Sequence, residues 1–230
     1  MNIRWRLNKR ELHILMQMMR GKDAPDSKND SVEDNLTEEE LSAMAEKWKQ
    51  GGYLVPTGGS WRLEEGLQLA ISTMIDPRSS FSCSRMSGVE MEKKTIFFHG
   101  QTIILMEDNG TEEVGLLWIP FLPLAIGAVS ELFCVEENDV SDSNVKIGAE
   151  LAVECLSPQG MAEPAIFHIE GHCGEETVYQ KTVRWEGDGF VVAGDGSDNT
   201  LYSKVEVVHE VTDWLAAVHK KCMEEVLRFE

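Results

Sequence analysis

The chain has few basic residues and no long apolar segment. Its 230 residues include 21 Lys and Arg against 40 Asp and Glu, a formal net charge of −19. Such a surface repels nucleic-acid phosphates, whose binding needs several Lys or Arg contacts. No segment reaches the roughly 18 apolar residues that a membrane span needs. The most apolar stretch, residues 116–133, is interrupted by Pro120, Pro123 and Glu131. We therefore expect neither a nucleic-acid partner nor membrane insertion.

Paired cysteine motifs and a secretion signal are also missing. The five cysteines are odd in number and widely spread, and no two form a CxxC motif. This usage favours reduced thiols in a cytosol over a disulfide framework. Residues 1–6 run straight into an amphipathic pattern without a separate apolar region and cleavage site, so they do not read as a signal peptide. We expect a cytoplasmic protein.

Motifs for catalysis or cofactor binding are lacking as well. The sequence contains no GxSxG nucleophile elbow, no Walker loop and no GxGxxG motif after a strand. Gly58-Gly59 reads as a hairpin turn rather than as a phosphate cradle. We expect no cofactor and no catalytic activity, although an enzyme of an unrecognised type remains an alternative.

What the N-terminal part does contain is a helix, a Gly-rich hairpin and a second helix within residues 36–76. Thr37 followed by three glutamates starts the first of these helices, and Gly51-Gly52 ends it. Together with an amphipathic helix before it, residues 1–78 have the outline of a winged helix. Glutamates at the start of the helix that precedes the wing would face DNA phosphates, so this unit is not expected to read DNA. The Ser-rich stretch 78–87 reads as a linker.

Residues 88–230 read as two unequal copies of one plan, antiparallel strands followed by a helix. The first copy places strands at 95–98, 102–107 and 114–119 and a helix at 121–133; the second places strands at 165–170, 177–185, 189–193 and 201–208 and a helix at 210–227. Residues 142–156 are ambiguous, with a helix favoured over a strand. The predicted fold class is α+β: an N-terminal winged-helix-like helical unit packed with an antiparallel β-sheet of two pseudo-symmetric halves and a C-terminal helix.

The densest group of potential metal ligands is His168, His172 and Cys173. Zinc favours such side chains in a tetrahedral arrangement. On a strand, however, the two histidines would lie on one face about 13 Å apart, so chelation requires a bend at Gly171. We interpret them as structural or solvent-facing histidines, and the zinc site remains the weaker alternative.

Three aromatic residues, Trp118, Trp185 and Phe190, lie on expected strands or near turns. Exposed aromatic side chains beside acidic rims are typical of recognition surfaces. We predict that these three contact a partner, with burial in the core as the alternative for each.

The order of the N-terminal elements resembles the opening of the EspG family, the cytosolic chaperones of type VII secretion. The resemblance lies in the 41–48 helix, the Gly-Tyr-Leu step at 52–54, a short wing with Trp61, and a helix ending at 75–77. The two strand-then-helix halves are similar to the pseudo-twofold plan of that family. The resemblance implies a non-catalytic chaperone or adaptor.

Such a protein binds a newly made helical-hairpin substrate of the WXG, LXG or PE–PPE type, shields its aggregation-prone tip and delivers it to the membrane machinery. No motif of the family allows individual binding residues to be carried over. The alternative from another class is a regulatory protein whose acidic winged-helix unit binds protein rather than DNA.

Overall fold

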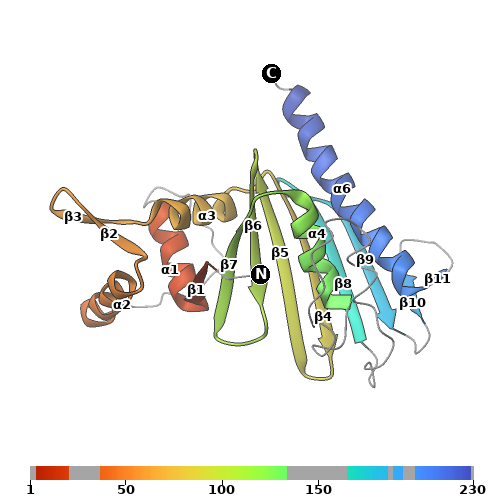
Figure 1. Cartoon of the computed structure of the whole chain (residues 1–230), viewed down its shortest axis with the longest axis horizontal. Helices are drawn as coiled ribbons and strands as arrows, with labels where there is room; N and C mark the ends of the chain where they lie inside the picture. The colour runs from red at the N-terminus through yellow and green to blue at the C-terminus, as the bar shows by residue number, and fades with distance from the viewer. Residues whose placement is uncertain (1–3, 21–36, 134–164, 186–188, 194–199, 229–230) are drawn as a thin grey trace, which may run out of the picture.

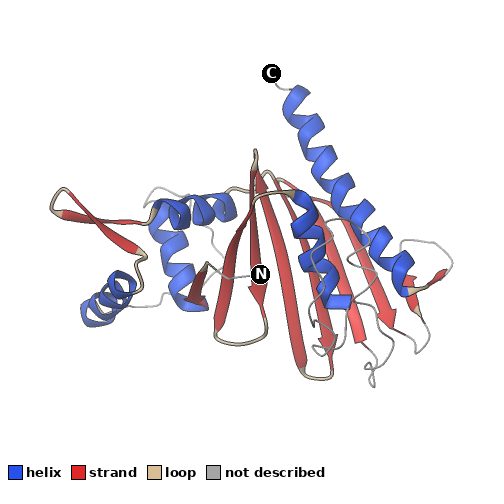
Figure 2. Ribbon diagram, in the orientation of Figure 1, coloured by secondary structure: helices blue, strands red, loops and turns tan. Residues whose placement is uncertain are grey.

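The computed structural model describes residues 4–20, 37–133, 165–185, 189–193 and 200–228. A large antiparallel sheet of nine strands runs through the molecule, in the order β1-β7-β6-β5-β4-β8-β9-β10-β11, and a separate two-stranded ribbon is formed by β2 and β3. Helices lie against this sheet (Figure 2). The predicted α+β class is confirmed, whereas the expected helix at 142–156 lies outside the described residues.

The strands of the large sheet are β1 (Trp5–Asn8), β4 (Ser79–Ser87), β5 (Glu90–His99), β6 (Thr102–Asp108), β7 (Glu113–Ile119), β8 (Ala165–Cys173), β9 (Glu176–Trp185), β10 (Phe190–Ala193) and β11 (Thr200–Tyr202). The ribbon consists of β2 (Leu54–Thr57) and β3 (Ser60–Leu63). The helices are α1 (Lys9–Arg20), α2 (Glu38–Gln50), α3 (Glu65–Ile75), α4 (Leu122–Ser130), the short 3₁₀ helix η1 (Glu131–Phe133) and α6 (Lys204–Arg228).

Two halves of the sheet repeat the same plan and meet in the middle. In the first half β4, β5, β6 and β7 are followed by α4, and in the second half β8, β9, β10 and β11 are followed by α6. The halves join where β4 pairs antiparallel with β8 along its whole length, from Ser79 opposite Cys173 to Ser87 opposite Ala165. One continuous sheet therefore carries both repeats.

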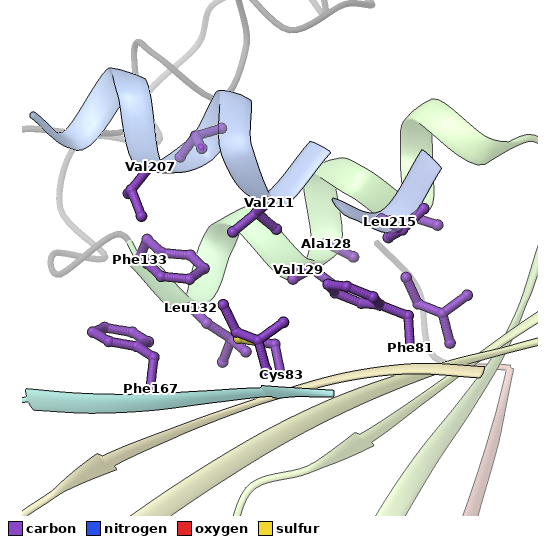
Figure 3. Close-up of a cluster of buried hydrophobic side chains, with 14 of the residues drawn as sticks. Phe81, Cys83, Ala128, Val129, Leu132, Phe133, Phe167, Val207, Val211 and Leu215 are labelled. Carbon is purple, nitrogen blue, oxygen red and sulfur yellow. The ribbon is translucent and has the colours of Figure 1, made fainter. Parts of the chain in front are cut away.

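One face of the sheet is covered by α4 and α6, which lie side by side over it (Figure 1). Inward side chains of alternate strand positions, such as Phe81, Cys83 and Phe167, meet Val129 of α4 and Val211 of α6 there (Figure 3). Phe133 stacks on Phe167 with ring centroids 4.4 Å apart. This is the main hydrophobic core.

The opposite face is covered in its first half only. Helices α1 and α3 pack against β5, β6 and β7 there, and α3 contributes Leu67, Ala70 and Ile71 to a second buried cluster with Ile104 and Leu116 of the sheet. That cluster contains no residue of β4, β8 or β9. In the described part of the chain, these three strands are left without a helix on this face.

An arm of α2 and the β2–β3 ribbon projects from the N-terminal part of the molecule (Figure 1). Thr37 and Glu40 form the predicted capping box at the start of α2. Lys47 Nζ donates a hydrogen bond to Oε1 of the buried Glu11 of α1 at 2.7 Å. This hydrogen bond raises the pKa of Lys47. Trp48 is the buried residue of α2, and Met44, Tyr53, Leu54 and Leu63 of the arm also pack against the second cluster.

The expected linker at 78–87 is wrong, because these residues form β4 in the middle of the sheet. Phe81 and Cys83 alternate with Ser80, Ser82 and Ser84, so the apolar residues enter the core while the serines occupy the other face. This is the period-two pattern of a strand with one polar side. The division of the chain into 1–78 and 88–230 stays a prediction.

Two further expectations at the ends of the chain are corrected. Residues 5–8 form the edge strand β1, paired with β7, before α1 begins. The expected strand over 201–208 is short, because α6 already begins at Lys204. Ser203 and Glu206 bond reciprocally to each other's backbone N–H at 3.3 and 2.8 Å, and this capping box sets the helix start.

Candidate partner-binding surface

The three predicted aromatic contacts lie in different environments. Trp118 is on β7 and is 51% exposed. Trp185 and Phe190 are cross-strand partners in β9 and β10, are only 5% and 0% exposed, and pack with ring centroids 4.8 Å apart. Both belong to the main hydrophobic core. As the chain is folded, only Trp118 of the three offers its ring to a partner.

The candidate metal ligands lie on opposite faces of β8. His168 and His172 are on the face away from the main core, whereas Cys173 is buried on the other side of the strand. Each histidine Nδ1 lies next to a threonine hydroxyl of β9, Thr182 at 3.3 Å and Thr177 at 3.2 Å. No group of three potential metal-binding side chains is found among the residues that the structure describes. The geometry does not bring the three candidates to one ion.

The uncovered face of β4, β8 and β9 is the most distinctive surface of the described chain. Most side chains on this face are serine, threonine and histidine residues from alternate positions of neighbouring strands. We call it the open quarter, and it is made of Ser80, Ser82, Ser84, Met86, Ile166, His168, Glu170, His172, Gln180, Thr182 and Arg184, with Met91 and Lys93 at its border on β5.

One end of the open quarter is apolar. Met86 of β4 lies directly opposite Met91 of β5 on one side and Ile166 of β8 on the other. These side chains are 42%, 41% and 38% exposed, so three neighbouring strands present large apolar groups to solvent. Single exposed hydrophobic residues are ordinary, but adjacent ones mark interaction sites. The sequence interpretation missed this group because it treated 78–87 as a linker.

The charge of the open quarter differs from that of the whole chain. Among the described residues, Lys93 and Arg184 are its cations and Glu170 is its carboxylate, and Arg184 is already engaged in an interaction within the protein. Asp108, next to Lys93 across β5 and β6, is bonded to Lys9 at 2.9 Å. The described part of this face therefore carries more cations than carboxylates, whereas the whole chain has a net charge of −19.

A shallow hollow of about 230 Å³ adjoins the open quarter where α1 crosses β6 and β7. Its apolar wall is formed mainly by Leu12, Met16 and Met106. Met106 is the cross-strand neighbour of Thr95 on β5, which in turn is the neighbour of Ser82 on β4. Thr95 and Ser82 are both buried, so this row does not form a continuous exposed surface between the hollow and the open quarter.

The cations of the projecting arm are engaged within the protein. Lys49 is paired with Glu46 and lies 4.9 Å from the centre of the Trp61 ring, and Arg62 is paired with Glu65 at 2.9 Å. Glu40 stands in the first turn of α2, and its bonds from Thr37 lower the pKa of its carboxyl group. The arm thus exposes a carboxylate-rich helix start rather than free cations.

None of the described helices is long and apolar enough to cross a membrane. No protein-family model matches the sequence, and no curated protein matches it. Among solved structures, the chain is similar to the type VII secretion system chaperone EspG5 of Mycobacterium tuberculosis, solved in complex with a PE25–PPE41 dimer. The similarity has a TM-score of 0.53 at 8% identity and covers 91% of this chain and 94% of that one. The chain therefore has an EspG-like fold over nearly its whole length.

Proposed function

We propose that the protein is a non-catalytic cytoplasmic chaperone or adaptor that binds a secreted helical-hairpin protein of a type VII secretion system. The observation that carries the proposal is the fold, which is shared with a secretion chaperone over nearly the full length of both chains. A likeness confined to one domain would carry much less weight, because a fold by itself supports many functions.

Two features of the surface support protein binding. Adjacent apolar side chains at Met86, Met91 and Ile166 stay exposed on an otherwise polar sheet face. Trp118 and Phe121, at the end of β7 and just before α4, are also exposed. Such patches cost solubility unless a partner uses them. The strongly acidic remainder of the surface keeps the free protein soluble.

The structural neighbour was solved with a PE–PPE dimer, so this class is the first client to test for the present chain. WXG and LXG proteins are further helical-hairpin candidates. The client would be held through a helical part, because packing an amphipathic helix against an apolar surface is a recurrent mode of recognition. The carboxylates of Glu38 and Glu39 on the arm make a nucleic-acid ligand less suitable.

Co-expression tests the proposal. The full chain is produced together with representatives of the PE–PPE, WXG and LXG classes, each with and without the chaperone. We expect at least one client to become soluble only in the presence of this chain and to elute with it as a stoichiometric complex in size-exclusion chromatography. Clients of all three classes that stay insoluble or elute separately would reject the proposed function.

A further inference from the structure

We propose that Asn109-Gly110 is a site of spontaneous covalent modification, at which the asparagine becomes aspartate and isoaspartate at a rate that the Asp108 carboxylate restrains. This inference is independent of the proposed function. Asn109 is the only asparagine of the chain that is followed by glycine. The pair lies in the turn between β6 and β7, at one end of the sheet (Figure 1), and both residues are exposed.

The reaction needs only the chain and water. The backbone nitrogen of Gly110, once it has lost its proton, attacks the side-chain carbonyl carbon Cγ of Asn109. The new N–Cγ bond closes a succinimide ring, while the Cγ–Nδ2 bond breaks and the nitrogen leaves as ammonia, taking up a proton from solvent. One water then opens the ring. Breaking the N–Cγ bond gives aspartate, whereas breaking the bond from the nitrogen to the backbone carbonyl carbon gives isoaspartate.

The fold requires at position 110 the residue type that leaves this nitrogen most accessible. Gly110 has a φ of 74°, in the left-handed region that glycine adopts without strain. A Cβ at this position would also lie 2.9 Å from the carbonyl oxygen of Met91 on β5. Because glycine has no Cβ, nothing on residue 110 itself shields its nitrogen from the Asn109 side chain.

Asp108 opposes the first step. The N–H of Gly110 donates a hydrogen bond to Oδ1 of Asp108 at 2.9 Å. A hydrogen bond that the protonated nitrogen donates, and a negative charge beside it, both disfavour loss of the proton. Nζ of Lys9 lies 2.9 Å from the same carboxylate oxygen and holds it in place. Asp108 is therefore a positioning residue that slows the attack.

Modification should loosen the start of α1. The backbone N–H of Lys9, the first residue of α1, donates to the carbonyl of Glu112 in the same turn at 2.9 Å. Isoaspartate lengthens the backbone of this turn, and both products place a new negative charge beside Asp108, where it competes for Lys9. Lys9 and Asp108 also line the hollow beside α1, so the modified chain should differ there from the newly made one.

Incubation of the full chain at about pH 7 and 8, followed by peptide mapping that separates the two products, tests the site. We expect Asn109 to react before any other asparagine, about tenfold faster at the higher pH, because the deprotonated fraction of the nitrogen rises tenfold per pH unit. Asp108→Ala should accelerate the reaction. Asn109→Gly keeps a turn-forming residue and should abolish both the modification and the increase of hydrogen exchange in α1 on ageing.

Two further comparisons keep the test independent of the folding of one variant. Asp108→Asn keeps an oxygen of the same shape but removes the charge, so its rate should lie between those of the original chain and Asp108→Ala. In urea, where the bond from Gly110 is lost, the original chain should react faster than when folded. An Asn109 that reacts no faster than Asn8, or a folded-state rate that neither Asp108 variant changes, would overturn the inference.

Discussion

The hydroxyl group of Tyr53 is bonded to both backbone groups of Arg6. It accepts the Arg6 N–H at 3.2 Å and donates to the Arg6 carbonyl at 2.8 Å. Arg6 lies in β1, the edge strand of the large sheet, and Tyr53 follows the end of α2. One side chain thus ties the arm to the body. It also satisfies backbone groups that an open strand edge would offer to another chain.

Replacing Tyr53 with Phe should loosen the arm. The change removes two hydrogen bonds and keeps the ring, so we expect the free energy of unfolding to fall by about 1–2 kcal/mol. Hydrogen exchange should increase in β2, β3 and at Arg6. Tyr179→Phe is the matched control, because the buried Tyr179 hydroxyl has no hydrogen-bond partner among the residues that the structure describes, and its loss should cost little. Unchanged hydrogen exchange in β2 and β3 would show that the Tyr53 hydroxyl does not hold the arm to β1.

Gly171 lets α6 pack directly on β8. A Cβ at this position would lie 2.4 Å from Cγ2 of Val218 and 3.2 Å from Cβ of Tyr179. Gly171→Ala should therefore displace α6 and destabilise the protein by about 1–3 kcal/mol, the usual cost of overpacking. Denaturant unfolding measures the change. Adding Val218→Ala to the variant makes room for the methyl group and should recover part of the loss.

The control for this prediction is Gly127→Ala in α4. A Cβ there meets no atom within 4 Å in the described part of the chain outside its own helix backbone, and alanine is the better helix former, so stability should rise by roughly 0.5–1 kcal/mol. Equal effects of the two glycine substitutions would show that close packing at Gly171 does not determine the cost.

Ser203 begins α6 through the capping box with Glu206. Bonds from Ser203 also lower the pKa of the Glu206 carboxyl group. Ser203→Ala should reduce the free energy of unfolding by about 1 kcal/mol, as is typical for a lost N-cap. Thr37→Ala removes the same cap from α2, in which Trp48 is the one buried residue. It should fray α2 locally in hydrogen exchange with a smaller change in global unfolding; equal global losses would contradict this contrast.

Local signals in the sequence located most elements of the fold. The Thr37 capping box, the glycines after α2 and the Asn109-Gly110 turn all mark boundaries that the structure contains. Ser203 and Glu206 carried the same signal for α6, but the β-branched residues after them favoured a strand. The strand β4 was missed because its high serine content indicated a linker. The alternation of Phe81 and Cys83 with serines, which is the period of a strand, was given less weight.

The candidate surface could not be predicted in the same way. Met86 and Ile166 are far apart in the chain and become neighbours only when β4 pairs with β8. Likewise, the burial of Trp185 and Phe190 follows from the packing of two hairpin strands under Phe133 and Phe167. A sequence pattern fixes which residues alternate, but the pairing of distant strands decides which face is covered.

The stability of the protein should fall on mild acidification because of His219. Its ring centroid lies 4.8 Å from that of Phe98, and its buried Nδ1 has no hydrogen-bond partner in the described part of the chain. Burial lowers the pKa of His219 below its usual value. Above the unfolded pKa of about 6.5, the ring is neutral in both states. As the pH falls below this value, the unfolded chain takes up the proton first, so stability is lost until the folded state is protonated too.

Denaturant unfolding at about pH 7.5 and 5.5, on either side of the ordinary histidine pKa, measures this loss. His219→Phe keeps a ring against Phe98 and should reduce the difference between the two conditions. The carboxyl groups of Glu64 and Glu206 also have lowered pKa values, but their contribution is lost in a lower range, below about 4.5. An unaltered pH dependence in His219→Phe would show that the contact with Phe98 does not disfavour the protonated ring.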